Sequence, residues 1–233
     1  MLRCNIRVNA FVFPSTFTMR QFIAAGFPPE KCFHIPTFVD TANIEYSPVN
    51  EGQILYFGRI VEEKGVHLLL QAYASLVGKK PRLIIVGCQD DIPYNRTLIS
   101  TYGDRVDFKN FMTKQELSLE IRKAMCVVIP SIWYDNLPNV LLEAYAHGRP
   151  VIAPNHGSFL ELDIHEKTGL LFEAGSQEAL RSSLAWAIAN PSAMATMGAR
   201  ARIAAETEFS PSLHLDRLIA LFSSCCEPRL TSS

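Results

Sequence analysis

The feature that most constrains the fold is an alternation of short apolar segments with amphipathic helical segments through the middle of the chain. The predicted strands lie at residues 53–57, 81–86, 106–111, 126–130 and 150–153. Helical patterns fill the gaps between them. Continuous apolar strands that alternate with amphipathic helices are typical of a parallel sheet covered on both faces. The sequence therefore predicts an α/β fold, a doubly wound parallel sheet followed by C-terminal helices.

The chain before this alternation has a different pattern. A short apolar strand at 9–13 and a helix at 16–25 precede a proline-rich connection with one brief extended piece at 32–35. We expect a boundary near residues 46–52, where the regular pattern begins. The pattern therefore predicts three parts: residues 1–46, a sheet domain at 47–207, and a C-terminal helix with its tail at 208–233.

Composition narrows the function classes. The 22 lysines and arginines nearly cancel the 23 aspartates and glutamates. The chain therefore has no surplus of positive charge that would indicate nucleic-acid binding. No apolar run approaches the roughly 20 residues that span a bilayer, and the start does not resemble a signal peptide. The cysteines form no CxxC pair, which favours free thiols in a reducing compartment and hence a cytoplasmic location. The scattered histidines predict no metal site.

Two predicted loops carry the polar residues that we expect to form a site. In open α/β sheets, ligands bind outside the carboxyl ends of the strands, where strand order reverses. The loop at 58–65 offers Arg59 and Lys64 between glycines, and such cations can bind phosphate. The alternative is surface charge, with Lys64 paired to Glu62 or Glu63.

The second loop, at 131–138, leads into a helix that is expected to open at Leu137–Pro138, with proline at the first helical position. Asp135 precedes this opening and Glu143 lies inside the helix. A free helix N-terminus attracts anions, and carboxylates accept hydrogen bonds from hydroxyl groups. Asn136 and the N–H groups after the proline are expected to meet a phosphate. The alternatives are a turn-forming or capping Asp135 and a solvated Glu143.

Other candidate signals are weaker. Gly87 permits close approach of the backbone at a third loop, 87–93, but no GxGxxG motif is present, which disfavours a nicotinamide dehydrogenase. Ser158 and Glu161 have the spacing of a capping box, and we prefer this interpretation to a catalytic Glu161. The sequence contains no GxSxG motif, so it does not support a serine hydrolase of the α/β type.

Taken in order, several short motifs resemble the group 1 retaining glycosyltransferases of GT-B architecture. The motifs are Gly58-Arg59-x4-Lys64-Gly65, Pro130-Ser131, Asp135-x7-Glu143-Ala144, Gly148-Arg-Pro-Val-Ile152 and Thr168-Gly-Leu-Leu171. The resemblance covers roughly residues 50–207. It implies that residues 47–207 form the Rossmann-like, nucleotide-sugar-binding half of a GT-B fold. Residues 1–46 would then be a remnant of the N-terminal acceptor domain with the interdomain linker.

The family transfers a sugar from a nucleotide-diphosphate donor to an acceptor, with retention of anomeric configuration. By resemblance, Arg59 and Lys64 would stabilise the diphosphate leaving group, Asp135 would bind sugar hydroxyls, and Glu143 would bind the ribose. The remaining donor-binding residues implied are Gly58, Gly87, Phe111, Met112, Asn136, Leu137, Pro138 and Asn139. The donor would be a UDP- or GDP-sugar, no metal or other cofactor is implied, and a glycan or lipid acceptor leaves peripheral membrane association open.

The chain departs from the family pattern in two ways. Asp135 stands where the family usually has Glu, and Leu137-Pro138 replaces a Phe-Gly pair, which removes one N–H. In addition, most of an acceptor domain is absent, so a fragment or a partner chain that supplies the other lobe is expected. A non-catalytic nucleotide-sugar-binding module is therefore the alternative function. An epimerase or phosphorylase of similar architecture is less well supported, since no pyridoxal lysine can be identified.

Overall fold

A computed structural model describes residues 8–89, 91–162 and 164–226 of the chain. The first residues of the predicted N-terminal part (1–7), Asp90 of the predicted third loop, Asp163 and the predicted tail (227–233) lie outside the described residues.

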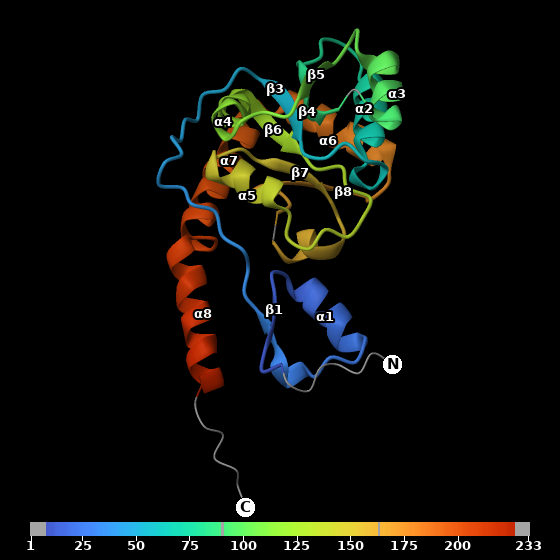
Figure 1. Cartoon of the computed structure of the whole chain (residues 1–233). Coiled ribbons are helices and arrows are strands. Elements are labelled where there is room, and N and C mark those ends of the chain that lie inside the picture. Colours follow the sequence, from blue (N-terminus) through green and yellow to red (C-terminus); the bar gives the residue numbers. More distant parts are fainter. Residues whose placement is uncertain (1–7, 90, 163, 227–233) are drawn as a thin grey trace, which may run out of the picture.

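Six parallel strands form the main sheet in the order β5-β4-β3-β6-β7-β8 (Figure 1). Their bounds are β3 (Gln53–Phe57), β4 (Leu83–Cys88), β5 (Asp107–Asn110), β6 (Ala124–Val128), β7 (Val151–Pro154) and β8 (Gly169–Phe172). The chain runs outward from β3 to β5 and then returns to β6, which pairs with the other side of β3. The predicted doubly wound parallel sheet is confirmed, and its strand order reverses between β3 and β6.

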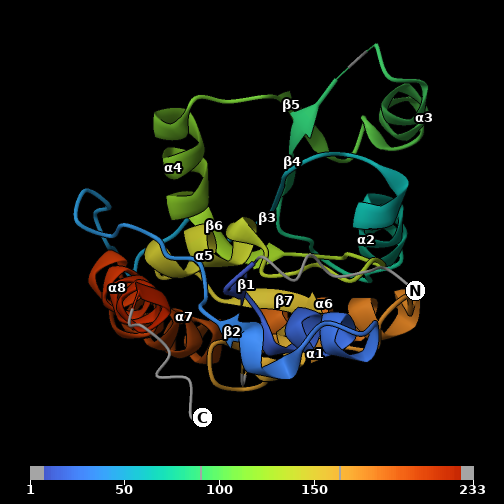
Figure 2. The ribbon, with the colours of Figure 1, turned by 60° about the horizontal axis from the view of Figure 1, so that its bottom comes forward.

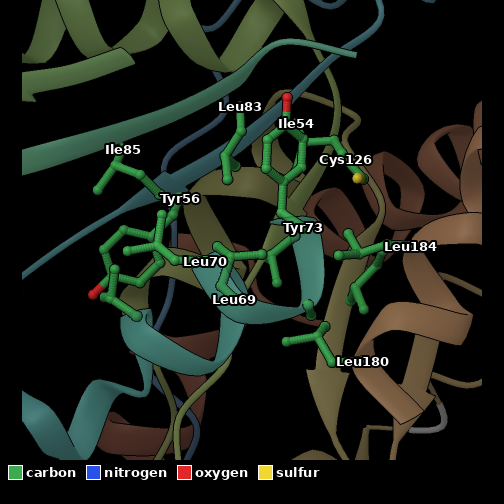
Figure 3. Close-up of a cluster of buried hydrophobic side chains, with 14 of the residues drawn as sticks. Ile54, Tyr56, Leu69, Leu70, Tyr73, Leu83, Ile85, Cys126, Leu180 and Leu184 are labelled. Carbon is green, nitrogen blue, oxygen red and sulfur yellow. The ribbon is translucent and has the colours of Figure 1, made fainter. Parts of the chain in front are cut away.

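Helices cover both faces of this sheet, and the central strands are therefore buried on both sides. One face holds α2 (Val66–Ala74), α3 (Pro93–Tyr102) and α6 (Gln177–Ala189); the other holds α4 (Lys114–Lys123), α5 (Asn139–Ala146) and α7 (Pro191–Thr207). Ile54 and Tyr56 of β3 belong to the first core, whereas Leu55 and Phe57 belong to the second. This alternation follows from the two-residue period of a strand. Figure 3 shows the first core, in which side chains of α2 and α6 meet those of the sheet.

The N-terminal part forms a small unit of its own beside the main sheet. Two parallel strands, β1 (Phe11–Phe13) and β2 (Cys32–His34), are joined through α1 (Thr16–Ala24) and a short 3-10 turn, η1 (Pro29–Lys31). Figures 1 and 2 show this unit next to the main domain, with α8 (Pro211–Cys226) running alongside. The connection between the two parts is held to the C-terminal helices, since Val39 N–H donates to Phe209 O at 2.9 Å.

Most predicted elements agree with the structure to within a few residues. The capping box that begins α4 at Thr113 is confirmed in both of its hydrogen bonds. Among the described cysteines, Cys126 and Cys225 are free thiols. None of the helices in the described residues is long and apolar enough to cross a membrane.

The predicted start of α5 is wrong. The helix begins at Asn139, and Pro138 precedes it as the N-cap with an extended ψ of 125°. A proline at the first helical position would need a helical ψ. Here Pro138 instead turns the chain into the helix, and its carbonyl accepts from Leu141 N–H at 3.0 Å.

Candidate functional site

The two predicted loops meet at the carboxyl edge of β3 and β6. Residues 58–65 follow β3 and residues 131–138 follow β6, and these strands are paired. The carbonyl of Glu63 accepts from Ile132 N–H at 3.0 Å and from Trp133 N–H at 3.3 Å. Because backbone hydrogen bonds fix the two loops to each other, their side chains face a shared site at the point where strand order reverses.

Gly65 makes this approach possible. It has a left-handed φ of 66°, and a Cβ at this position would lie 2.0 Å from the carbonyl oxygen of Pro130, two residues after the end of β6. Glu62, Glu63 and Lys64 form a single 3-10 turn, η2, just before it. The glycine therefore allows the turn that carries Lys64 to lie directly against the second loop.

Lys64 and Asp135 form an ion pair across the two loops. Lys64 Nζ donates to Asp135 Oδ1, and the side chains are only 24% and 13% exposed. Lys64 is thus paired neither with Glu62 nor with Glu63. The second oxygen of the carboxylate, Oδ2, is buried and has no hydrogen-bond partner among the described residues. A buried carboxylate oxygen without a donor is costly, so Asp135 retains an acceptor that a hydroxyl group could satisfy.

Arg59 lies at the rim of the same site. Its side chain is 69% exposed, and its guanidinium is 4.0 Å from Glu63 Oε1, a weak contact that leaves it available to an anion. The backbone beneath it is fixed, because the Tyr56 hydroxyl donates to Arg59 O at 2.6 Å. Burial raises the pKa of Tyr56, and the nearby Asp135 charge raises it further, so this hydroxyl stays a donor.

Gly58 and Gly87 pack against each other. A Cβ on Gly87 would lie 2.1 Å from the carbonyl oxygen of Gly58, and both glycines have positive φ values, 110° and 138°. The close approach predicted for Gly87 is thus an approach of the Gly58 backbone. Gly87 also lies inside β4, which continues to Cys88, so the predicted end of this strand at Val86 is wrong. Its register with β5 shifts at that point, which lets the strand continue past the glycine.

The helix α5 carries Asn139 and Glu143 behind the Asp135 loop. Asn139 is exposed at its first position, and Glu143 is half-buried one turn further on. His147, on the same face, is a structural residue, since its ring nitrogens contact Glu143 O and Ser118 Oγ, each at 2.7 Å. Burial raises the pKa of Glu143, and Lys114 offsets part of this rise. A carboxylate that is partly stripped of water favours a ligand that can donate hydrogen bonds to it.

This rise in pKa predicts how the variant Glu143→Gln affects stability. The pKa of the Glu143 carboxyl in the folded protein lies above its unfolded value near 4.5, so the protein loses stability as pH rises between these values. The neutral glutamine of Glu143→Gln does not ionise, so the variant avoids this loss. In urea unfolding, the free energy of unfolding of the variant should therefore rise relative to that of the parent between pH 4.5 and pH 7.5. The exposed Glu173→Gln is the control. An equal pH dependence in the parent and in Glu143→Gln would contradict the burial effect.

The other predicted donor-binding residues occupy different positions around this site. Asn136 is exposed, but its Oδ1 lies 3.0 Å from the Ser15 hydroxyl. Leu137 is 8% exposed and packs in the second core, and Pro138 is half-buried beside it. Phe111 and Met112 follow β5 at the far edge of the sheet, and Phe111 is 61% exposed whereas Met112 packs on the core.

Two residues next to this site were not identified as part of it. Ser15 contacts Asn136, and Glu161 Oε2 accepts from Thr16 N–H at 2.8 Å. The predicted capping box of Ser158 and Glu161 is therefore wrong: the turn η3 (Gly157–Glu161) has His156 at its N-cap, and Ser158 Oγ donates to Asp135 O at 2.9 Å. These partners are distant in sequence, so no local pattern could indicate them.

A pocket of about 440 Å³ lies next to the end of the Asp135 loop, at Leu137. Its described lining includes Ser15, Leu137, Glu161 and Arg217 but neither Arg59 nor Lys64. It belongs to the junction between α1, η3 and the C-terminal helices rather than to the edge of the sheet where the cations lie.

The fold and this site define a Rossmann-like α/β domain with its candidate ligand site at the switch point of the sheet. A family model described as glycosyl transferases group 1 matches residues 41–204, and the chain belongs to this family. The predicted membership of the group 1 glycosyltransferases is confirmed, and so is the Rossmann-like half of a GT-B fold.

Individual relatives agree with this family. The chain is 31% identical over 142 residues to the uncharacterized glycosyltransferase MJ1607 of Methanocaldococcus jannaschii. This match covers 60% of this chain and 35% of that protein. It is 26% identical over 249 residues to a GDP-mannose-dependent monoacylated alpha-(1-6)-phosphatidylinositol monomannoside mannosyltransferase of Corynebacterium glutamicum, covering 97% of this chain and 65% of that protein.

A solved structure matches the fold. The crystal structure of Anabaena Alr3699/HepE in complex with UDP and glucose superposes with a TM-score of 0.83 at 23% identity, and the match covers 93% of this chain and 63% of that one. The chain therefore spans about two thirds or less of the length of these three proteins.

Proposed function

We propose that this chain binds a nucleotide-diphosphate sugar and acts as the donor domain of a retaining glycosyltransferase that transfers the sugar to a glycan or lipid acceptor. The observation that carries the proposal is the pairing of Lys64 with Asp135 between two loops that share backbone hydrogen bonds. A cation matches the diphosphate of such a donor, and a carboxylate oxygen that has no hydrogen-bond partner among the described residues matches the hydroxyl groups of its sugar.

Each side chain would have a distinct task. Lys64 and the exposed Arg59 would neutralise the diphosphate, whose negative charge grows as the bond to the sugar breaks. Asp135 would accept from a sugar hydroxyl through Oδ2. Glu143 would accept from the ribose hydroxyls, and Phe111 with Met112 would contact the base from the edge of the sheet. The N–H groups at the start of α5 would add phosphate contacts.

The relatives support a nucleotide-sugar donor but differ in its base. The Corynebacterium relative is a GDP-mannose-dependent enzyme by name, and the Anabaena structure contains UDP with glucose. Calorimetric titration of the chain with UDP, UDP-glucose, GDP and GDP-mannose should therefore show binding of one nucleotide series, with dissociation constants of roughly 1 μM to 1 mM. Adenosine monophosphate, which lacks a diphosphate, is the control and should bind more weakly. Absence of binding of all four compounds would contradict the proposal.

Donor binding and sugar transfer are separate questions for this chain, because it matches no more than about two thirds of its relatives' length. A nucleotide-sugar-binding module without transferase activity is therefore the second candidate. Incubation of the chain with a radiolabelled donor and a glycan or lipid acceptor distinguishes the two. Labelled product supports transfer by this chain, whereas binding without product supports the second candidate.

A further inference from the structure

We propose that the amino end of α1 is a positioning element for the donor-sugar site, acting through Ser15 on the loop that carries Asp135. The inference rests on the proposed function and extends it to the N-terminal part of the chain. Residues 1–46 would then contribute to donor recognition in addition to connecting the domains.

The first contact is the hydrogen bond of Ser15. This residue caps α1, since its Oγ accepts from Thr18 N–H at 3.1 Å, and it is only 2% exposed. The same Oγ lies 3.0 Å from Asn136 Oδ1, and Asn136 directly follows Asp135. A buried hydroxyl thus joins the start of a helix to the residue next to the proposed sugar-binding carboxylate.

The turn η3 provides the second contact. At its end, Glu161 Oε2 accepts from the first N–H of α1, on Thr16, at 2.8 Å, a favourable position for a negative charge. Within the same turn, Ser158 Oγ donates to the backbone carbonyl of Asp135 at 2.9 Å. One short turn therefore holds both the start of α1 and the backbone of Asp135.

Aromatic rings complete the contact. The ring of Phe17, in the first turn of α1, lies 5.1 Å from that of Tyr134, and Tyr134 lies 5.0 Å from the ring of His156. His156 Nε2 in turn contacts Ser131 O at 3.1 Å. The loop at 131–136 is thus packed between α1 and the residues just after β7.

These contacts define the consequence of loosening α1. Lys64, the proposed phosphate-binding residue, holds the carboxylate of Asp135, whereas Ser15, Ser158 and the aromatic rings hold its loop through separate contacts. If the second set is weakened, the cations still reach the phosphates, but Asp135 is less well placed for the sugar. The affinity for a nucleotide sugar should fall while that for the nucleotide alone is retained, because small misplacements weaken directed hydrogen bonds.

The test compares binding of UDP with UDP-glucose, and of GDP with GDP-mannose, to the 233-residue chain and to Ser15→Ala. Loss of one hydrogen bond predicts a roughly fivefold weaker affinity for the nucleotide sugar, with the bare nucleotide within about twofold of the parent. The matched control is Ser176→Ala, which removes the N-cap hydrogen bond of α6 far from the loop. It should leave both affinities unchanged.

A second variant keeps the proposal testable if Ser15→Ala folds poorly. Glu161→Gln alters an exposed contact to α1 and should weaken nucleotide-sugar binding in the same direction, by about twofold. Equal losses for the nucleotide and its sugar in both variants, or no loss in either, would overturn the positioning role while leaving the proposed function intact. If the parent chain binds none of the four compounds, the proposed function fails and this inference fails with it.

Discussion

Replacing Lys64 with alanine should remove most donor binding and also destabilise the protein. The side chain pairs with Asp135, whose other oxygen is buried and has no hydrogen-bond partner among the described residues, so the variant removes the cation from a largely buried carboxylate. We expect a loss of about 2 kcal/mol in the free energy of unfolding, less than for a fully buried pair because Lys64 is partly exposed. Loss of a charged hydrogen bond to phosphate should weaken donor binding roughly 10- to 100-fold. Urea unfolding and calorimetric titration measure the two effects.

Arg59→Ala is the matched control for this variant. Arg59 is 69% exposed and only 4.0 Å from Glu63, so its removal should change stability by less than about 0.5 kcal/mol. Its expected role at the diphosphate nevertheless predicts weaker donor binding, by about tenfold. Unchanged donor affinity in both variants would refute the phosphate assignment. The double variant Lys64→Met/Asp135→Leu should recover stability, because apolar residues can replace a buried pair, but it should not recover binding.

Gly65→Ala should have the largest effect on stability. A Cβ there would lie 2.0 Å from Pro130 O, and buried backbone atoms just after a central strand cannot move away without a large loss of stability. The clash adds to the strain of an alanine at φ 66°, so we expect a loss of about 4 kcal/mol and a fall in melting temperature of roughly 8–16 °C. The turn that carries Lys64 would also shift, which predicts weak donor binding in any protein that remains folded.

Gly175→Ala separates the clash from the strain. Gly175 has a similar φ of 76°, but no atom of the described residues lies within 4 Å of the position its Cβ would take. The variant should therefore lose only about 1 kcal/mol and bind donor normally. Thermal unfolding of the two variants side by side gives the comparison. Similar losses of stability in the two variants would mean that the backbone at Pro130 shifts to accommodate the new Cβ. The close contact between the two loops would then not be required for stability.

Local sequence patterns predicted the structure correctly where the interactions that determine it are also local. The apolar period identified the strands of the sheet, and the Thr113 capping box was correct because both of its partners lie within one helical turn. The same local reasoning failed at Ser158 and Glu161, which have capping-box spacing but bond to Asp135 and Thr16 instead. Local propensity indicates that such side chains favour nearby backbone groups, and tertiary contacts decide which group they reach.

By itself, the sequence determined the fold class, the edge of the sheet where a site should lie and the family, since these depend on periodicity and on the order of motifs. It proposed Lys64 and Asp135 as separate residues with separate tasks. Only the tertiary structure decided that they form one ion pair, that Gly87 makes room for Gly58, and that Ser15 contacts the loop beside Asp135. Each of these contacts joins residues far apart in the chain, and their meeting depends on how β3, β6 and α1 are placed around a common core.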